Sequence, residues 1–182
     1  MFEHMKQLLV EVDDETFRKL KRSRRPGAGH GVAQAEDLRL GTSEESFMTQ
    51  PIEGGCLCGE VRYRITGAPL ISTTCQCRTC RKASAAAIVP WLHLDAATFS
   101  FVAGKPVELN SSPAVTRTFC GRCGTPLTYW ATSYGPTIDV TTGSLDDPEA
   151  FPPVVHVWTS HKLSWVTLAD GLPSFEEGPP SA

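Results

Sequence analysis

The sequence predicts a mainly β domain, mostly antiparallel, with few short helices. From Pro51 onward, short runs that alternate apolar and polar residues are separated by glycine, proline, asparagine and aspartate. Side chains two positions apart share one face of a strand, so each run can contribute one face to a common core. We expect one short helix, at about 77–86. The alternating runs are 61–65, 98–102, 115–119, 137–140 and 154–158.

The length of 182 residues suits one domain with tails. We place the body of this domain at 51–172 and a Pro/Gly-rich tail at 173–182. Residues 1–50 form an extension, in which a short strand and a capped helix (8–22) precede a flexible linker from Ser23. A ribbon-helix-helix arm is an alternative interpretation of this start, although no second helix pattern follows.

Composition and charge argue against two classes of partner. The formal net charge of -3 creates no basic field that would attract a nucleic-acid backbone. A nucleic-acid-binding zinc knuckle would need a basic stripe interleaved with aromatic residues, and only the 78–82 patch is basic. The sequence lacks both an uninterrupted apolar stretch of about 18 residues and a signal-peptide pattern. We therefore expect a soluble, cytoplasmic protein that binds neither nucleic acid nor membranes.

The chain has seven cysteines, an odd number that disulfide pairing cannot use up, and they lie in tight clusters. Both observations favour metal binding over a disulfide framework. Cys56 and Cys58 lie two apart, so both sulfurs project from one face of an extended chain. Cys120 and Cys123 form a C-x-x-C knuckle. These two pairs supply four thiolates, a closed tetrahedron typical of structural zinc. The alternative is that one pair forms a disulfide or stays as buried free thiols.

A third cluster brings Cys75, Cys77 and Cys80 within six residues. Three protein ligands leave the fourth corner of a zinc tetrahedron free for water or substrate, as in catalytic sites. We therefore predict that this second zinc ion is catalytic. In the alternative interpretation, His93 or His156 fills the fourth position and makes the site structural.

Charged residues near the third cluster are candidates for substrate binding. Three thiolates on Zn²⁺ leave a formal charge of about -1, which Arg78, Arg81 and Lys82 can offset. The same cations could hold a substrate carboxylate, or could simply be solvated. His156 could relay a proton, or be packed with its nitrogens satisfied. We expect Asp146–Asp147 to start a turn.

A series of motifs spans most of the predicted domain. They are Gly-x-Cys-x-Cys-Gly at 54–59, Val-Arg at 61–62, Cys-x-Cys-x-x-Cys-Arg-Lys at 75–82, Phe-Cys-x-x-Cys-Gly-x-Pro-Leu at 119–127, Gly-x-Leu-Asp-Asp at 143–147, Pro-Pro-x-x-His at 152–156, and Trp165. In this order, the motifs resemble those of the glutathione-dependent formaldehyde-activating enzyme family, which also includes the centromere protein V type of domain.

The resemblance implies a tent-like, two-sheet antiparallel β fold with two zinc ions per chain. It assigns Cys56, Cys58, Cys120 and Cys123 to the structural ion, and the 75–80 cluster to the catalytic one. The implied activity is the condensation of formaldehyde with glutathione to S-hydroxymethylglutathione, classed as a carbon-sulfur lyase in the reverse direction. The implied partners are a thiol such as glutathione, with formaldehyde or another aldehyde. A non-catalytic zinc module that binds a protein partner is the alternative from another class.

Overall fold

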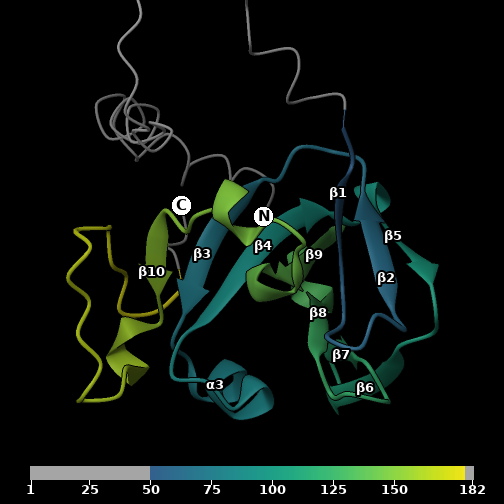
Figure 1. The fold of residues 1–182 in the computed structure, drawn as a ribbon. Helices are drawn as coiled ribbons and strands as arrows, with labels where there is room; N and C mark the ends of the chain where they lie inside the picture. The colour runs from purple at the N-terminus through teal and green to yellow at the C-terminus, as the bar shows by residue number, and fades with distance from the viewer. Residues whose placement is uncertain (1–49, 179–182) are drawn as a thin grey trace, which may run out of the picture.

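The computed structural model describes residues 50–178 of the chain. Ten strands form two sheets in this part of the chain, as Figure 1 shows, which confirms the mainly β, two-sheet prediction. The predicted strand and helix at 8–22 lie outside the described residues. The smaller sheet is antiparallel, with the strand order β1 (Ile52–Gly55), β2 (Arg62–Ile65) and β5 (Phe99–Ala103).

The larger sheet has seven strands and is antiparallel except for one pair. The parallel pair joins β10 to β3, so the predicted antiparallel pattern holds everywhere else in this sheet. All five alternating runs of the sequence overlap strands. The strand order is β10 (Val155–Val157), β3 (Ile71–Cys75), β4 (Val89–Asp95), β9 (Thr137–Thr141), β8 (Pro126–Ala131), β7 (Val115–Phe119) and β6 (Val107–Ser112).

The one α-helix of the described residues, α3 (Arg78–Ser84), lies within the predicted range of 77–86. It begins where the Cys77 side chain accepts a hydrogen bond from the Cys80 N–H, and ends at Ala85, whose φ of 50° is left-handed. No helix in the described part is long and apolar enough to span a membrane. Within residues 50–178, the 3₁₀ helices are η2 (Ala96–Thr98), η3 (Thr132–Tyr134), η4 (Thr142–Ser144), η5 (Pro148–Ala150) and η6 (Thr159–His161).

The main apolar core lies between the two sheets. Tyr63 and Ile65 of β2 are fully buried, whereas Arg64 between them is exposed, as the alternation predicts. Leu92 and Leu94 face them from β4 in the larger sheet. Burial of such side chains stabilises the fold by about 1.5–3 kcal/mol each.

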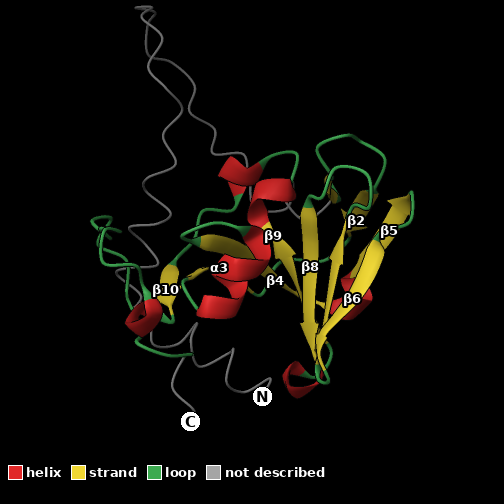
Figure 2. Ribbon diagram, turned by 90° about the horizontal axis from the view of Figure 1, so that it is seen from below, coloured by secondary structure: helices red, strands yellow, loops and turns green. Residues whose placement is uncertain are grey.

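A second cluster of buried residues lies on the opposite face of the larger sheet. It includes Cys75, Cys80 and Trp91, together with Val89. Helix α3 contacts β4 on this side, and Figure 1 shows the helix at the end of the sheet where β3 and β4 are connected, whereas Figure 2 views it from below. The cysteines of the third cluster therefore lie where α3 meets the sheet.

The segment after 172 is paired with strand β10. The His156 N–H donates to the Pro173 carbonyl and the Phe175 N–H donates to the His156 carbonyl, each at 2.9 Å. The Trp158 N–H donates to the Glu177 carbonyl at 2.8 Å. Residues 173–177 thus extend the β10 edge of the larger sheet.

Candidate metal centres and candidate active site

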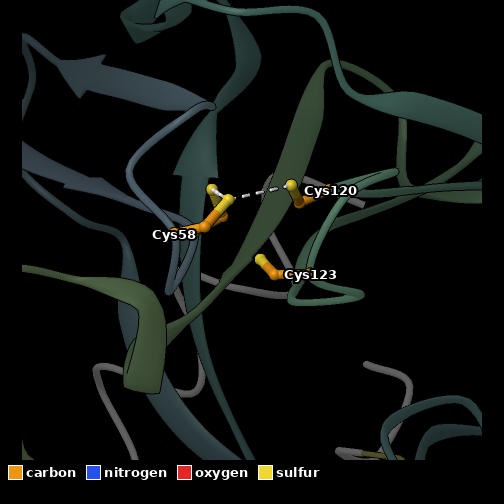
Figure 3. Close-up of side chains that lie close together, drawn as sticks. Cys58, Cys120 and Cys123 are labelled. Atoms are coloured by element: carbon orange, nitrogen blue, oxygen red, sulfur yellow. Dashed lines mark hydrogen bonds between the residues drawn. The ribbon is translucent and has the colours of Figure 1, made fainter.

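Four cysteine sulfurs from two distant turns lie together in the structure. The sulfurs of Cys56, Cys58, Cys120 and Cys123 all lie within 4.8 Å of one another, and Figure 3 shows three of them converging. Sulfur–sulfur distances are 3.5 Å for Cys56–Cys58 and 3.7 Å for Cys58–Cys120. A tetrahedral zinc ion with Zn–S bonds of about 2.3 Å requires edges of about 3.8 Å. The donor set and its spacing therefore fit zinc.

Glycines in a left-handed conformation shape both turns of this group. Gly59 and Gly124 have φ of +76°, which glycine adopts without steric cost. The Val61 N–H donates to the Cys56 sulfur at 3.2 Å, an interaction that stabilises a thiolate. Gly54 and Gly55, which precede the first turn, lie in β1.

Thr125 connects the two turns. Its hydroxyl oxygen accepts a hydrogen bond from the Leu57 N–H at 3.1 Å and lies 3.2 Å from the Cys123 sulfur. Hydrogen bonds from the Thr125 hydroxyl and backbone lower the pKa of Cys123 to about 5. The thiolate form, which binds metal, is thus favoured at neutral pH.

The sulfurs of Cys75, Cys77 and Cys80 form the second group, also within 4.8 Å of one another. Cys75 ends β3, Cys77 caps α3, and Cys80 lies one turn into the helix. The Cys80 N–H donates to the Cys77 sulfur at 3.3 Å, and the Thr79 hydroxyl lies 3.1 Å from the same sulfur. Hydrogen bonds with Cys75 and Cys80 hold the pKa of Cys77 well below its ordinary value.

All seven cysteines lie within the described residues, and none is in a disulfide. Among residues 50–178, no histidine, aspartate, glutamate or further cysteine joins the group of three. The two cysteine groups could therefore hold one metal ion each, four-sulfur and three-sulfur respectively.

His93 uses both ring nitrogens away from the cysteines. Its Nδ1 lies 2.7 Å from Asp139 Oδ1, and its Nε2 lies 2.9 Å from the Thr73 hydroxyl. This arrangement argues against His93 as a fourth metal ligand.

His156 is also fully engaged and is nearly completely buried. Its Nδ1 lies 2.5 Å from the Thr74 hydroxyl and its Nε2 lies 3.0 Å from both Asp170 carboxylate oxygens. His156 pairs with Thr74, which precedes Cys75 on β3, so the imidazole and the Cys75 sulfur lie on opposite faces of the sheet. The structure separates His156 from the three-sulfur group.

The predicted basic residues lie on a different face of α3 from the sulfurs. Arg78, Arg81 and Lys82 line an open cavity of about 570 Å³ with Trp165, which is exposed. Positions 78, 81, 82 and 85 follow helical spacing, whereas Cys77 and Cys80 define another face. The Arg81 Nε also donates to the Gln76 carbonyl at 3.0 Å. We call this surface the basic stripe (Arg78, Arg81, Lys82).

Sequence reasoning missed a row of side chains across the larger sheet. Arg117, Tyr129, Asp139 and His93 are successive cross-strand partners on β7, β8, β9 and β4. Directly paired residues share one face of a sheet, and this face is the one that bears Cys75. The signal in the sequence was an arginine on the alternating run 115–119.

Aromatic rings complete this face of the sheet. Ring centroids lie 6.0 Å apart for Trp91–Tyr129 and 5.9 Å apart for Tyr129–Tyr134, and the Arg117 guanidinium carbon lies 4.7 Å from the Tyr129 centroid. Burial raises the pKa of Tyr129, while the charge of Arg117 acts against that rise. We call Arg117, Trp91, Tyr129 and Tyr134 the aromatic-arginine wall.

Comparison with known proteins defines the class. The family model described as "Glutathione-dependent formaldehyde-activating enzyme" matches residues 51–161, more than half of the chain. The chain therefore belongs to the glutathione-dependent formaldehyde-activating enzyme family, as its motifs predict.

One solved structure and one negative result complete the comparisons. A crystal structure of a Rhodobacter sphaeroides protein is similar at 17% sequence identity with a TM-score of 0.45, covering 68% of this chain and 98% of that one. None of the curated proteins matches the chain.

Proposed function

We propose that the chain is a zinc-dependent carbon–sulfur lyase that acts on the adduct of a thiol and an aldehyde, of the S-(hydroxymethyl)glutathione synthase type. The observation that supports this proposal best is the three-sulfur group, Cys75, Cys77 and Cys80, beside a separate four-sulfur group. The family match supports glutathione and formaldehyde as the substrate pair.

In the synthetic direction, the thiol sulfur adds to the formaldehyde carbon. The C–S bond forms, the C=O π bond breaks, and the thiol proton ends on the new hydroxyl oxygen. A zinc ion bound by the three sulfurs would supply acidification of the thiol and polarisation of the carbonyl. The lyase direction reverses each change.

The chain's own residues orient and shield this chemistry. The Thr79 hydroxyl and the Cys80 N–H hold the Cys77 sulfur in place. Trp91 is buried in the same cluster as Cys75 and Cys80, so one side of the group is apolar and excludes water. The partly exposed Tyr129 packs against that cluster, and the ring of the exposed Tyr134 lies 5.9 Å from the Tyr129 ring.

The test measures zinc per chain and follows formaldehyde and glutathione by NMR with and without protein. We expect two zinc ions per chain and an accelerated condensation. Replacing Cys80 by alanine should remove one zinc ion and abolish acceleration, while the circular dichroism spectrum stays native. Full zinc loading without acceleration would refute the reaction, and an unfolded Cys80→Ala protein would favour the non-catalytic zinc module.

A further inference from the structure

The aromatic-arginine wall and the basic stripe both carry positive charge near the three-sulfur group, but they lie on different surfaces. The stripe lines an open cavity on the outer side of α3, and no cysteine lines that cavity. Arg117 instead lies on the sheet face that bears Cys75. Its position therefore favours Arg117, over the basic stripe, as the cation that contacts a ligand bound at the three-sulfur group.

The Arg117 guanidinium is held in place and is partly buried. It lies over the Tyr129 ring at 4.7 Å, a cation–π geometry that orients the planar guanidinium. Tyr129 in turn contacts Trp91 and Tyr134 through their rings. A cation fixed in this way loses less side-chain entropy when it binds an anion than a flexible surface lysine does.

Arg117 has no carboxylate partner among residues 50–178. The ion pairs in that part of the chain use Arg62, Arg64 and Arg122, together with His93 and His156. Asp139, the nearest acid in the row, is already 2.7 Å from His93. The charge of Arg117 is therefore available to an anion that enters the site.

Tyr129 connects Arg117 to the region of the sulfurs. Its ring lies under the Arg117 guanidinium and packs against the buried cluster that includes Cys75 and Cys80. The guanidinium therefore borders the same cluster as the three-sulfur group.

We propose that Arg117, held against the Tyr129 ring, binds a carboxylate of the thiol substrate and so selects acidic thiols. This inference rests on the proposed function and deepens it by naming the residue that recognises the substrate's charge. A guanidinium suits this task because its planar fork can grip a carboxylate through two hydrogen bonds. The basic stripe then has no part in substrate selection.

The experiment compares glutathione with glutathione diethyl ester, which lacks both carboxylates. Binding of each to the zinc-loaded full chain is measured by calorimetry for the wild type, Arg117→Gln, Arg117→Lys and Lys82→Gln. We expect Arg117→Gln to weaken glutathione binding by about tenfold and to leave ester binding unchanged. Arg117→Lys should recover part of the loss, and Lys82→Gln should bind both ligands like the wild type.

Arg64→Gln is the matched control, because Arg64 lies on the smaller sheet and pairs with Glu53. Its affinities should equal those of the wild type. The proposal is overturned if Arg117→Gln weakens both ligands equally, if only its zinc content falls, or if Lys82→Gln produces the tenfold loss. The proposal is also refuted if the wild type binds glutathione no more tightly than glutathione diethyl ester.

The proposed reaction and the proposed role of Arg117 can be refuted independently of each other. Absence of NMR-detected condensation by the wild type would refute the lyase activity even if Arg117 sets the preference for acidic thiols. A wild type that condenses the substrates while Arg117→Gln keeps the acid preference would refute only the role of Arg117.

Discussion

Gly54 lies against the buried ring of Tyr63 in the core between the two sheets. A Cβ atom at position 54 would lie 2.3 Å from the Tyr63 hydroxyl oxygen and 2.6 Å from the Ser144 carbonyl oxygen. Tyr63 cannot move away easily, because it is fully buried and its hydroxyl lies 2.7 Å from the Ser144 hydroxyl. We expect Gly54→Ala to lower the free energy of unfolding by about 1–3 kcal/mol, measured by urea denaturation of the zinc-loaded protein.

Gly143→Ala is the control for this prediction. A Cβ at Gly143 would meet no atom within 4 Å, and this glycine does not have a positive φ. Its free energy of unfolding should change by less than about 0.5 kcal/mol. Equal stability of the two variants would contradict the steric argument.

At the same scale, the two cysteine groups that could hold metal could be predicted from the sequence, whereas the aromatic-arginine wall could not. Cys75, Cys77 and Cys80 are close in the chain, so their spacing alone brings the sulfurs together. Arg117 and Tyr129 meet only through the register of β7 and β8, which local patterns do not reveal. His156 was a reasonable relay candidate by type, but the face on which it lies depends on its pairing with β3.

Among the elements, alternation identified β2, whose buried side chains share one face, and also β9 and β10, whose residues are nearly all buried. It did not identify β3, whose residues are all buried, or β6, whose residues are all exposed. Strands β4 and β8 contain Pro90 and Pro126, which weaken a strand pattern. Burial on both faces or on neither is decided by tertiary packing, so the period of the sequence does not determine it.

The β10–β3 pair depends on a buried polar chain through His156. The imidazole joins Thr74 of β3 to Asp170 of the segment that follows β10. The Gln76 amide also donates to the Thr74 hydroxyl, at 3.1 Å. We expect His156→Ala to lower the free energy of unfolding by about 2–4 kcal/mol, because it leaves a cavity and removes two hydrogen bonds. Urea denaturation with zinc present measures this loss.

Asp170→Asn changes the other end of the same polar chain, and we expect it to lower the free energy of unfolding less than His156→Ala does. The hydrogen bond with His156, followed by one from the Leu172 N–H, lowers the pKa of Asp170. A lowered pKa in the folded state stabilises the fold above the unfolded pKa of about 4, and this contribution is lost as the pH falls further. Since the Asp170 side chain is half exposed, we expect Asp170→Asn to cost less than about 1 kcal/mol at pH 7 and progressively less as the pH falls through the folded pKa of Asp170. An Asp170→Asn loss as large as that of His156→Ala would contradict this account.

At the scale of the whole molecule, the two cysteine groups differ in how far apart along the sequence the segments lie that each one brings together. The four-sulfur group joins the β1–β2 turn of the smaller sheet to the β7–β8 turn of the larger sheet. The three-sulfur group joins only the end of β3 to the first turn of α3. A clip across a long loop removes more entropy from the unfolded chain than a local one. The first ion would therefore stabilise the fold, and the second would affect it little.

Cys123→Ser and Cys77→Ser test this difference at one cysteine of each group, and both of these cysteines are half-buried. Loss of the metal ion from the four-sulfur group in Cys123→Ser should lower the free energy of unfolding by on the order of 3 kcal/mol, because metal binding at such a site is coupled to folding. The Tm of Cys123→Ser should then fall by about 6–12 °C relative to the zinc-loaded wild type, and that of Cys77→Ser by less than half as much. Calorimetry with zinc analysis of each variant measures both quantities. If Cys77→Ser lost as much stability as Cys123→Ser, the three-sulfur group would be a second structural clip, and its proposed chemistry would lose its basis.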